Sequence, residues 1–81
     1  MSELKLAEIA IVISNREKSA CPVNDLLTQY GDYIIARMGV PHRSRQMFII
    51  SVVMEAPAEK ITQLSDELNK LGNIQIKTMM I

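Results

Sequence analysis

A stretch near the middle of the chain, QMFIISVVMEA from Gln46 to Ala56, limits the folds open to this sequence. It is too short to span a membrane as a helix, and its β-branched residues favour a strand. With a period of two residues, one face carries Phe48, Ile50, Val52 and Met54, and the other carries Met47, Ile49, Ser51, Val53 and Glu55. Both faces are mostly apolar, which is typical of a central strand covered on both sides.

A second segment, from Leu4 to Ser14, has the same two-sided character. Ala7, Ile9, Ile11 and Ile13 form one face, and Leu6, Glu8, Ala10 and Val12 form the other. We therefore expect a second central strand here. Two less apolar segments, 32–39 and 73–81, are predicted to be the outer strands, with Ile34, Ala36 and Met38 sharing one face of the former.

Two amphipathic helices are expected between these strands. Their apolar stripes are Val23, Leu26, Leu27 and Tyr30 in the first helix and Ile61, Leu64, Leu68 and Leu71 in the second. The first helix has two candidate starts. Asn15 could cap a helix that begins at Arg16, with Pro22 kinking its interior, or Ser19 could be the cap, which places Pro22 in the first turn. Gly72 is expected just past the end of the second helix.

The resulting order, β-α-β-β-α-β, predicts one α+β domain over residues 1–81 with a ferredoxin-like fold. Four antiparallel strands would form the sheet, with both helices on one face and the two most apolar strands at its centre. Two helices can cover only one face of such a sheet. The second apolar face would be unusually large for a monomer, so we expect a homo-oligomer, either a dimer or a tetramer.

Composition excludes several functional classes. The net charge is zero, which argues against direct nucleic-acid binding, and the chain shows neither a signal peptide nor a membrane span. Cys21 is the only cysteine, so no internal disulfide forms, and a reducing, cytoplasmic location is expected. His42 and Cys21 cannot supply a zinc site alone. We read them as a loop histidine and an inert thiol, and expect no metal or cofactor.

Catalytic patterns are not recognisable either. No Ser/His/Asp or Cys/His pairing occurs at a known spacing, and Arg16 and Asn24 do not reproduce the phosphate loop of acylphosphatases, which share this topology. RNA binding by the sheet would need several exposed aromatics on the central strands, which offer Phe48 alone. We therefore expect no enzymatic activity.

Three basic residues are the candidate ligand-binding site. Arg16 and Lys18 follow a central strand near a helix start, where backbone N–H groups favour an anion, and the alternative is a solvated charged loop. Arg37 lies in an outer strand and is expected on the uncovered sheet face, where it could hold a carboxylate or a second subunit. Its alternative is a packed stem with the charged head in water.

Three motifs resemble those of a known family. They are Arg16-Glu17-Lys18, Val23-Asn24-Asp25-Leu26-Leu27, and Ile35-Ala36-Arg37-Met38-Gly39-Val40-Pro41. With the ending Gln75-Ile76-Lys77-Thr78, they make the chain similar to regulators of the iron-only hydrogenase system, which are ACT-like proteins compared with the ligand-binding half of nickel-responsive repressors. His42 and Cys21 do not reproduce the nickel ligands, so no nickel site is implied.

That resemblance implies a non-enzymatic regulatory domain that senses a small molecule and acts as an oligomer, with a role in transcription through a partner. A ligand-free module that assembles with another protein through an open strand edge is the alternative.

Overall fold

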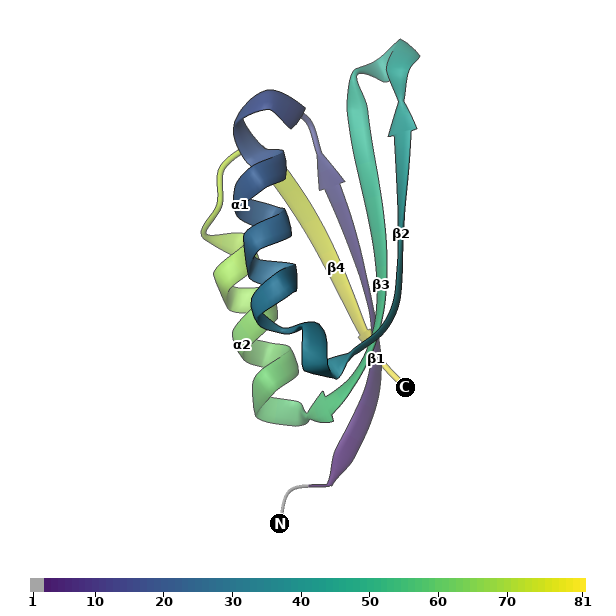
Figure 1. Ribbon diagram of the computed structural model, residues 1–81, viewed down its shortest axis with the longest axis vertical. Coiled ribbons are helices and arrows are strands. Elements are labelled where there is room, and N and C mark those ends of the chain that lie inside the picture. Colours follow the sequence, from purple (N-terminus) through teal and green to yellow (C-terminus); the bar gives the residue numbers. More distant parts are fainter. Residues whose placement is uncertain (1–2) are drawn as a thin grey trace.

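The computed structural model describes residues 3–81, apart from the side chains of residues 16 and 17. In chain order, the elements are β1 (Leu4–Ile13), α1 (Arg16–Gln29), the 3-10 turn η1 (Gly31–Tyr33), β2 (Ile34–His42), the 3-10 turn η2 (Arg43–Arg45), β3 (Met47–Pro57), α2 (Ala58–Asn69) and β4 (Ile74–Met80). The strands form one antiparallel sheet in the order β2-β3-β1-β4 (Figure 1). The predicted ferredoxin-like fold is confirmed.

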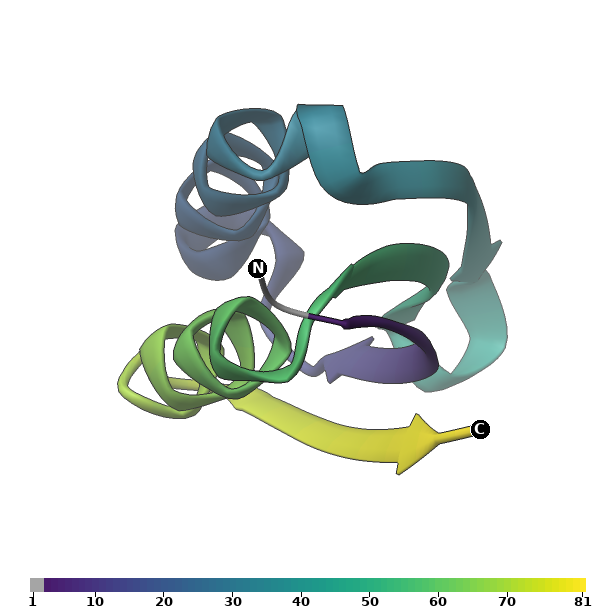
Figure 2. The ribbon, with the colours of Figure 1, turned by 90° about the horizontal axis from the view of Figure 1, so that it is seen from below.

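Both helices lie on the same face of the sheet, so the molecule has two layers (Figures 1 and 2). The core between them is formed by one face of each central strand and by the stripes of the two helices. Its buried apolar residues are Ala7, Ile9, Ile11, Ile13, Val23, Leu27, Tyr30, Ile50, Val52, Met54, Ala56, Ile61, Leu64 and Leu68. Burying each large aliphatic side chain contributes roughly 1.5–3 kcal/mol, so this layer carries most of the folding free energy.

The start of α1 resolves the two alternatives left by the sequence. The helix begins at Arg16, Asn15 is its N-cap, and the Asn15 side chain accepts a hydrogen bond from the Lys18 N–H. Pro22 therefore lies inside the helix, where it cannot donate the usual backbone hydrogen bond. Ser19 does not cap the helix, because its hydroxyl donates to the Gly72 carbonyl at 2.9 Å.

Two local expectations were wrong. A β-bulge at the start of β2 pairs Ile34 with Met54 and Ala36 with Val53, so Ile34 and Ala36 lie on opposite faces of the sheet. The second expectation was that Gly72 directly follows the end of α2. The helix is instead capped by Lys70, and the residue with a left-handed backbone in the following loop is Asn73, with φ of 64°, and not Gly72. Asparagine tolerates this conformation better than most residues because its side chain can bond locally.

Tyr30, the C-cap of α1, is buried beside Glu67 of α2. Burial raises the pKa of the Tyr30 phenol above its ordinary value of 10.0, and the Glu67 carboxylate raises it further by its charge and by a hydrogen bond.

Among residues 3–81, no helix is long and apolar enough to cross a membrane.

Tyr30→Phe should therefore remove a loss of stability at alkaline pH. Because the folded-state pKa is raised, the native state disfavours the phenolate, and stability is full below about pH 10 and falls as the pH rises above it. Urea denaturation of the wild type and of Tyr30→Phe between neutral and strongly alkaline pH measures this difference. An equal alkaline loss in Tyr30→Phe and the wild type would contradict the assignment.

Candidate ligand cleft and open sheet face

The hairpin formed by β2, η2 and β3 extends beyond the N-terminal end of α1 (Figure 1). Gln46 reverses the chain after η2 in a left-handed conformation, with φ of 54°. Within the hairpin, the Phe48 ring lies directly over Gly39, so that a Cβ atom at Gly39 would come within 2.8 Å of the Phe48 Cζ. This aromatic–glycine contact packs the two strands of the extension closely together.

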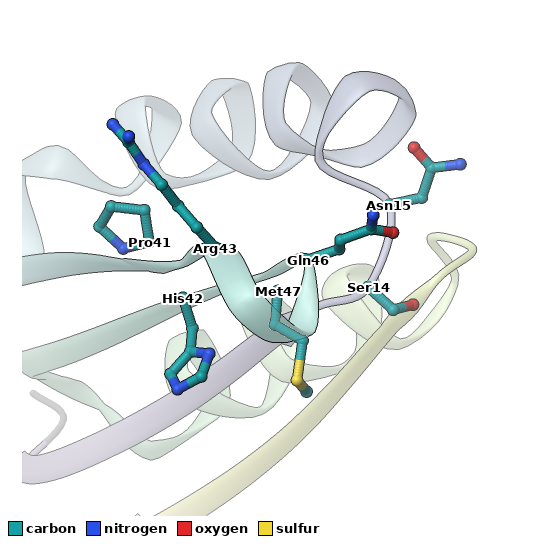
Figure 3. A pocket seen from close by; sticks show the side chains of 7 residues that line it. All are labelled: Ser14, Asn15, Pro41, His42, Arg43, Gln46 and Met47. Atoms are coloured by element: carbon teal, nitrogen blue, oxygen red, sulfur yellow. The ribbon is translucent and has the colours of Figure 1, made fainter.

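A cleft of about 500 Å³ lies where the hairpin end faces the junction of β1 and α1. Such a volume is typical of sites for small molecules. The cleft is lined by Ser14, Asn15, Pro41, His42, Arg43, Gln46 and Met47 (Figure 3). From the hairpin end, Arg43 and His42 extend to opposite sides, which spreads the basic groups around the opening (Figure 3).

The chemistry of the cleft favours a polar anion. Arg43 supplies a permanent positive charge, and the side-chain amides of Asn15 and Gln46 can both donate and accept hydrogen bonds. Among the described residues that line it, none is acidic. The His42 Nδ1 lies 3.3 Å from the Ser44 hydroxyl.

The inner wall of the cleft is tied to the loop between α2 and β4. The Ser14 N–H and hydroxyl both bond the Asn73 carbonyl, at 2.9 and 3.0 Å, and the Ser19 hydroxyl bonds the neighbouring Gly72 carbonyl. These long-range bonds join segments more than fifty residues apart in the sequence. They fix the position of Ser14 and Asn15 relative to the sheet.

The three predicted site residues are not brought together as a group. Lys18 is exposed in the first turn of α1, near the cleft, and the side chain of Arg16 lies outside the described residues. The expectation that Arg37 faces the uncovered side of the sheet was wrong. Arg37 pairs with Val52 on the helix-facing side, and its Nη2 donates to the Asn24 Oδ1 at 2.6 Å.

Sequence reasoning did not single out Arg43 and Gln46, which lie at the hairpin end. One signal was available, because residues 33–54 contain three arginines and no acidic residue. The left-handed turn at Gln46, which presents its side chain to the cleft, has no comparable sequence signal because glutamine is not enriched in that conformation.

The second face of the sheet has no helix over it (Figure 2). The strand registers assign to this open face Leu6, Glu8, Ala10 and Val12 from β1, Ala36, Met38, Val40 and His42 from β2, Met47, Ile49, Ser51, Val53 and Glu55 from β3, and Gln75, Lys77 and Met79 from β4. Met38 and Met79 are 62% and 58% exposed. The open face is therefore an apolar surface in contact with solvent.

Four polar side chains lie between the ends of the open face: Glu8 and Ser51 on the central strands, and Gln75 and Lys77 on the edge strand β4. Glu8 accepts a hydrogen bond from the Ser51 hydroxyl, so these two polar side chains satisfy each other. Outside the undescribed side chains of residues 16 and 17, residues 3–81 contain no group of three or more His, Cys, Asp and Glu side chains that could hold a metal ion.

Comparison with known proteins gives a family and a set of similar folds. A family model described as "TM1266-like: Iron-only hydrogenase system regulator, putative" matches residues 5–78. The structure of uncharacterized protein TM1266 from Thermotoga maritima has a TM-score of 0.94 at 32% identity, covering 98% of this chain and 99% of that one. No curated protein matches the chain.

Two more distant structures share the fold. The ACT domain of GTP pyrophosphokinase from Chlorobium tepidum has a TM-score of 0.76 at 18% identity, covering 94% of this chain and 86% of that one. The protein CPII from Thiomonas intermedia K12, solved with ADP, AMP and acetate, has a TM-score of 0.54 at 13% identity, covering 98% and 91%. These likenesses show that the fold is ACT-like.

Gly39→Ala should destabilise the hairpin that forms the outer wall of the cleft. The new methyl group would lie 2.8 Å from the Phe48 ring, and the cost of moving the ring, about 1–3 kcal/mol, exceeds the 0.5–1 kcal/mol that a strand gains when glycine becomes alanine. We expect a net loss of about 1 kcal/mol in urea denaturation. Gly31→Ala is the matched control, because nothing lies within 4 Å of its added Cβ. Equal stability of the two variants would show that the Phe48 contact is unimportant.

Proposed function

Because the chain belongs to the TM1266-like family of iron-only hydrogenase system regulators, we propose that it is a non-enzymatic regulatory domain. It acts as a homo-oligomer, a dimer or a tetramer, and it responds to a small anionic ligand. The observation that carries this proposal is the open sheet face, which is apolar on strands that are already covered on the other side.

The composition of the open face supports self-association. Half-buried side chains such as Val12, Ile49 and Val53 lie at its centre, and exposed methionines lie on the outer strands. Methionine side chains adapt to irregular apolar surfaces, which suits them to an interface. A second copy of the same face removes this surface from water without requiring any other protein.

The basic cleft supports the sensing part of the proposal. Its volume and its arginine, amide and hydroxyl groups suit a small molecule with a carboxylate or a phosphate. Lys18, in the first turn of α1, adds positive charge near its inner wall. The ADP, AMP and acetate bound by CPII are anions of this kind, and they guide the choice of compounds for a screen.

The alternative is an assembly module without a ligand. β2 is an edge strand whose residues 35–42 are all exposed, so its free backbone groups could pair with a strand of another protein. Affinity capture from a native lysate separates the two proposals. Recovery of one partner in stoichiometric amount, unchanged by added small anions, would favour the assembly module.

Met79→Lys should break the self-association, whereas Met80→Lys should leave it intact. The two residues are neighbours in β4 with exposures of 58% and 46%, but Met79 lies on the open face and Met80 lies on the helix-facing side. Burying a lysine in an apolar interface carries a desolvation cost, so we expect the dissociation constant to rise at least about tenfold for Met79→Lys. Sedimentation velocity at micromolar concentration measures this.

The wild type should sediment as a dimer or a tetramer in the same experiment. A wild type that stays monomeric would remove the oligomeric part of the proposal. Equal dissociation of the two lysine variants would instead move the interface away from the open face.

Arg43→Ala should weaken the response to anions, whereas Arg37→Ala should not. A thermal-shift screen of amino acids and nucleotides with the wild type identifies compounds that raise the melting temperature. For these compounds, Arg43→Ala removes the one described arginine that lines the cleft, while Arg37 bonds Asn24 outside it. We expect the affinity of Arg43→Ala to fall by about tenfold or more, as for the loss of one charged hydrogen bond. Equal losses in both variants would exclude the cleft as the site.

A further inference from the structure

Charge is distributed unevenly along the sequence of this molecule, which measures 45 Å in its longest dimension. Residues 33–54 carry three arginines and no acidic residue. The whole chain has nine basic and nine acidic residues, so the remainder carries a net charge of −3. The chain has a net charge of zero, but its positive and negative charges are therefore unevenly distributed along the sequence.

The strand register places two acidic residues toward one end of the open face, and the basic turn η2 lies beyond the other end. Arg43 and Arg45 lie in η2, at the end of the hairpin where His42 pairs with Met47. Glu55 pairs with Leu6 near the other end of the sheet. Glu8, the next residue of β1 on the same face after Leu6, lies closer to the middle of the sheet. Apolar residues occupy most of the surface between these basic and acidic ends.

We infer that two copies pack sheet against sheet with their long axes antiparallel, so that the basic end of each copy lies over the acidic end of the other. This inference rests on the proposed self-association through the open face and specifies its geometry. A twofold axis that lies in the interface, perpendicular to the long axis of the molecule, brings Arg45 toward the partner's Glu55, and the reverse contact forms at the other end by symmetry.

Electrostatics selects this orientation over its rival. Two packed sheets keep their strands within about 30° of each other, a condition that both parallel and antiparallel long axes satisfy. With parallel axes, the arginines of both copies would face each other, as would the glutamates, and like charges placed together across an interface are strongly unfavourable. Antiparallel axes convert both repulsions into attractions.

The size of the face also suits a second copy. The two larger dimensions of the molecule, 45 and 19 Å, enclose an area on the order of the ~800 Å² that each partner buries in a standard interface. A copy with the same dimensions covers the face along its whole length, including both charged ends.

Charge reversal tests the orientation directly. Arg45→Glu and Glu55→Arg each place like charges at both ends of an antiparallel dimer, so each should raise the dissociation constant by about tenfold or more at low salt. The effect should shrink as added salt screens the charges. The double variant Arg45→Glu/Glu55→Arg restores opposite charges at both ends and should associate like the wild type. An equimolar mixture of the two single variants should do the same by forming a heterodimer.

Matched controls carry the same charge changes on the helix layer. Lys70→Glu and Asp66→Lys alter exposed residues at the end and in the middle of α2, away from the open face, and should associate like the wild type. Circular dichroism of every variant checks that the fold is retained, and recovery in the mixture shows independently that both single variants are folded.

Each result decides a separate point. Single variants that associate as well as the wild type would overturn the antiparallel orientation while leaving self-association in place. Weakened single variants without recovery in the double variant or the mixture would also overturn it. A monomeric wild type would overturn the orientation together with the proposed self-association.

Discussion

The pairing of β1 with both β3 and β4 is the constraint on which the rest of the structure depends. This strand is paired on both sides over residues 7–13, and alternate residues there are buried on the helix-facing side. The four residues Ala7, Ile9, Ile11 and Ile13 are completely buried there. The intervening residues then fall on the open face, where Ala10 and Val12 remain apolar although no helix covers them. One strand thus contributes both to the buried core and to the apolar open face.

The fold was largely predictable because it depends on periodicity, which is a local property of the sequence. Two-residue alternation identified the central strands, and the stripes of Ile61, Leu64 and Leu68 and of Val23 and Leu27 identified the core faces of the helices. Arg37 was placed on the wrong face because the bulge near Ile35 adds one residue to β2, and a shift of one residue exchanges the two faces of a strand. No residue type near the bulge signals it.

The candidate site was less predictable because it depends on where loops meet in space. Anion binding at the start of α1 stays a prediction, although its N-cap, Asn15, does line the cleft. The opposite wall comes from the end of a hairpin, and its distance from Ser14 is set by the length and register of β2 and β3. The excess of arginine in residues 33–54 is readable, but its location beside the cleft follows only from the assembled sheet.

The bonds from Ser14 and Ser19 to the loop before β4 give the cleft two mechanically different sides. One side is anchored to the body of the domain, while the other is the far end of a two-stranded arm that extends past α1 (Figure 1). A displacement of one side relative to the other therefore meets less resistance in the arm than in the anchored wall. Small displacements near Gln46 would be passed along β2 and β3 as a change of tilt or twist, because paired strands bend as a unit. A molecule bound in the cleft would in this way change the twist of the sheet.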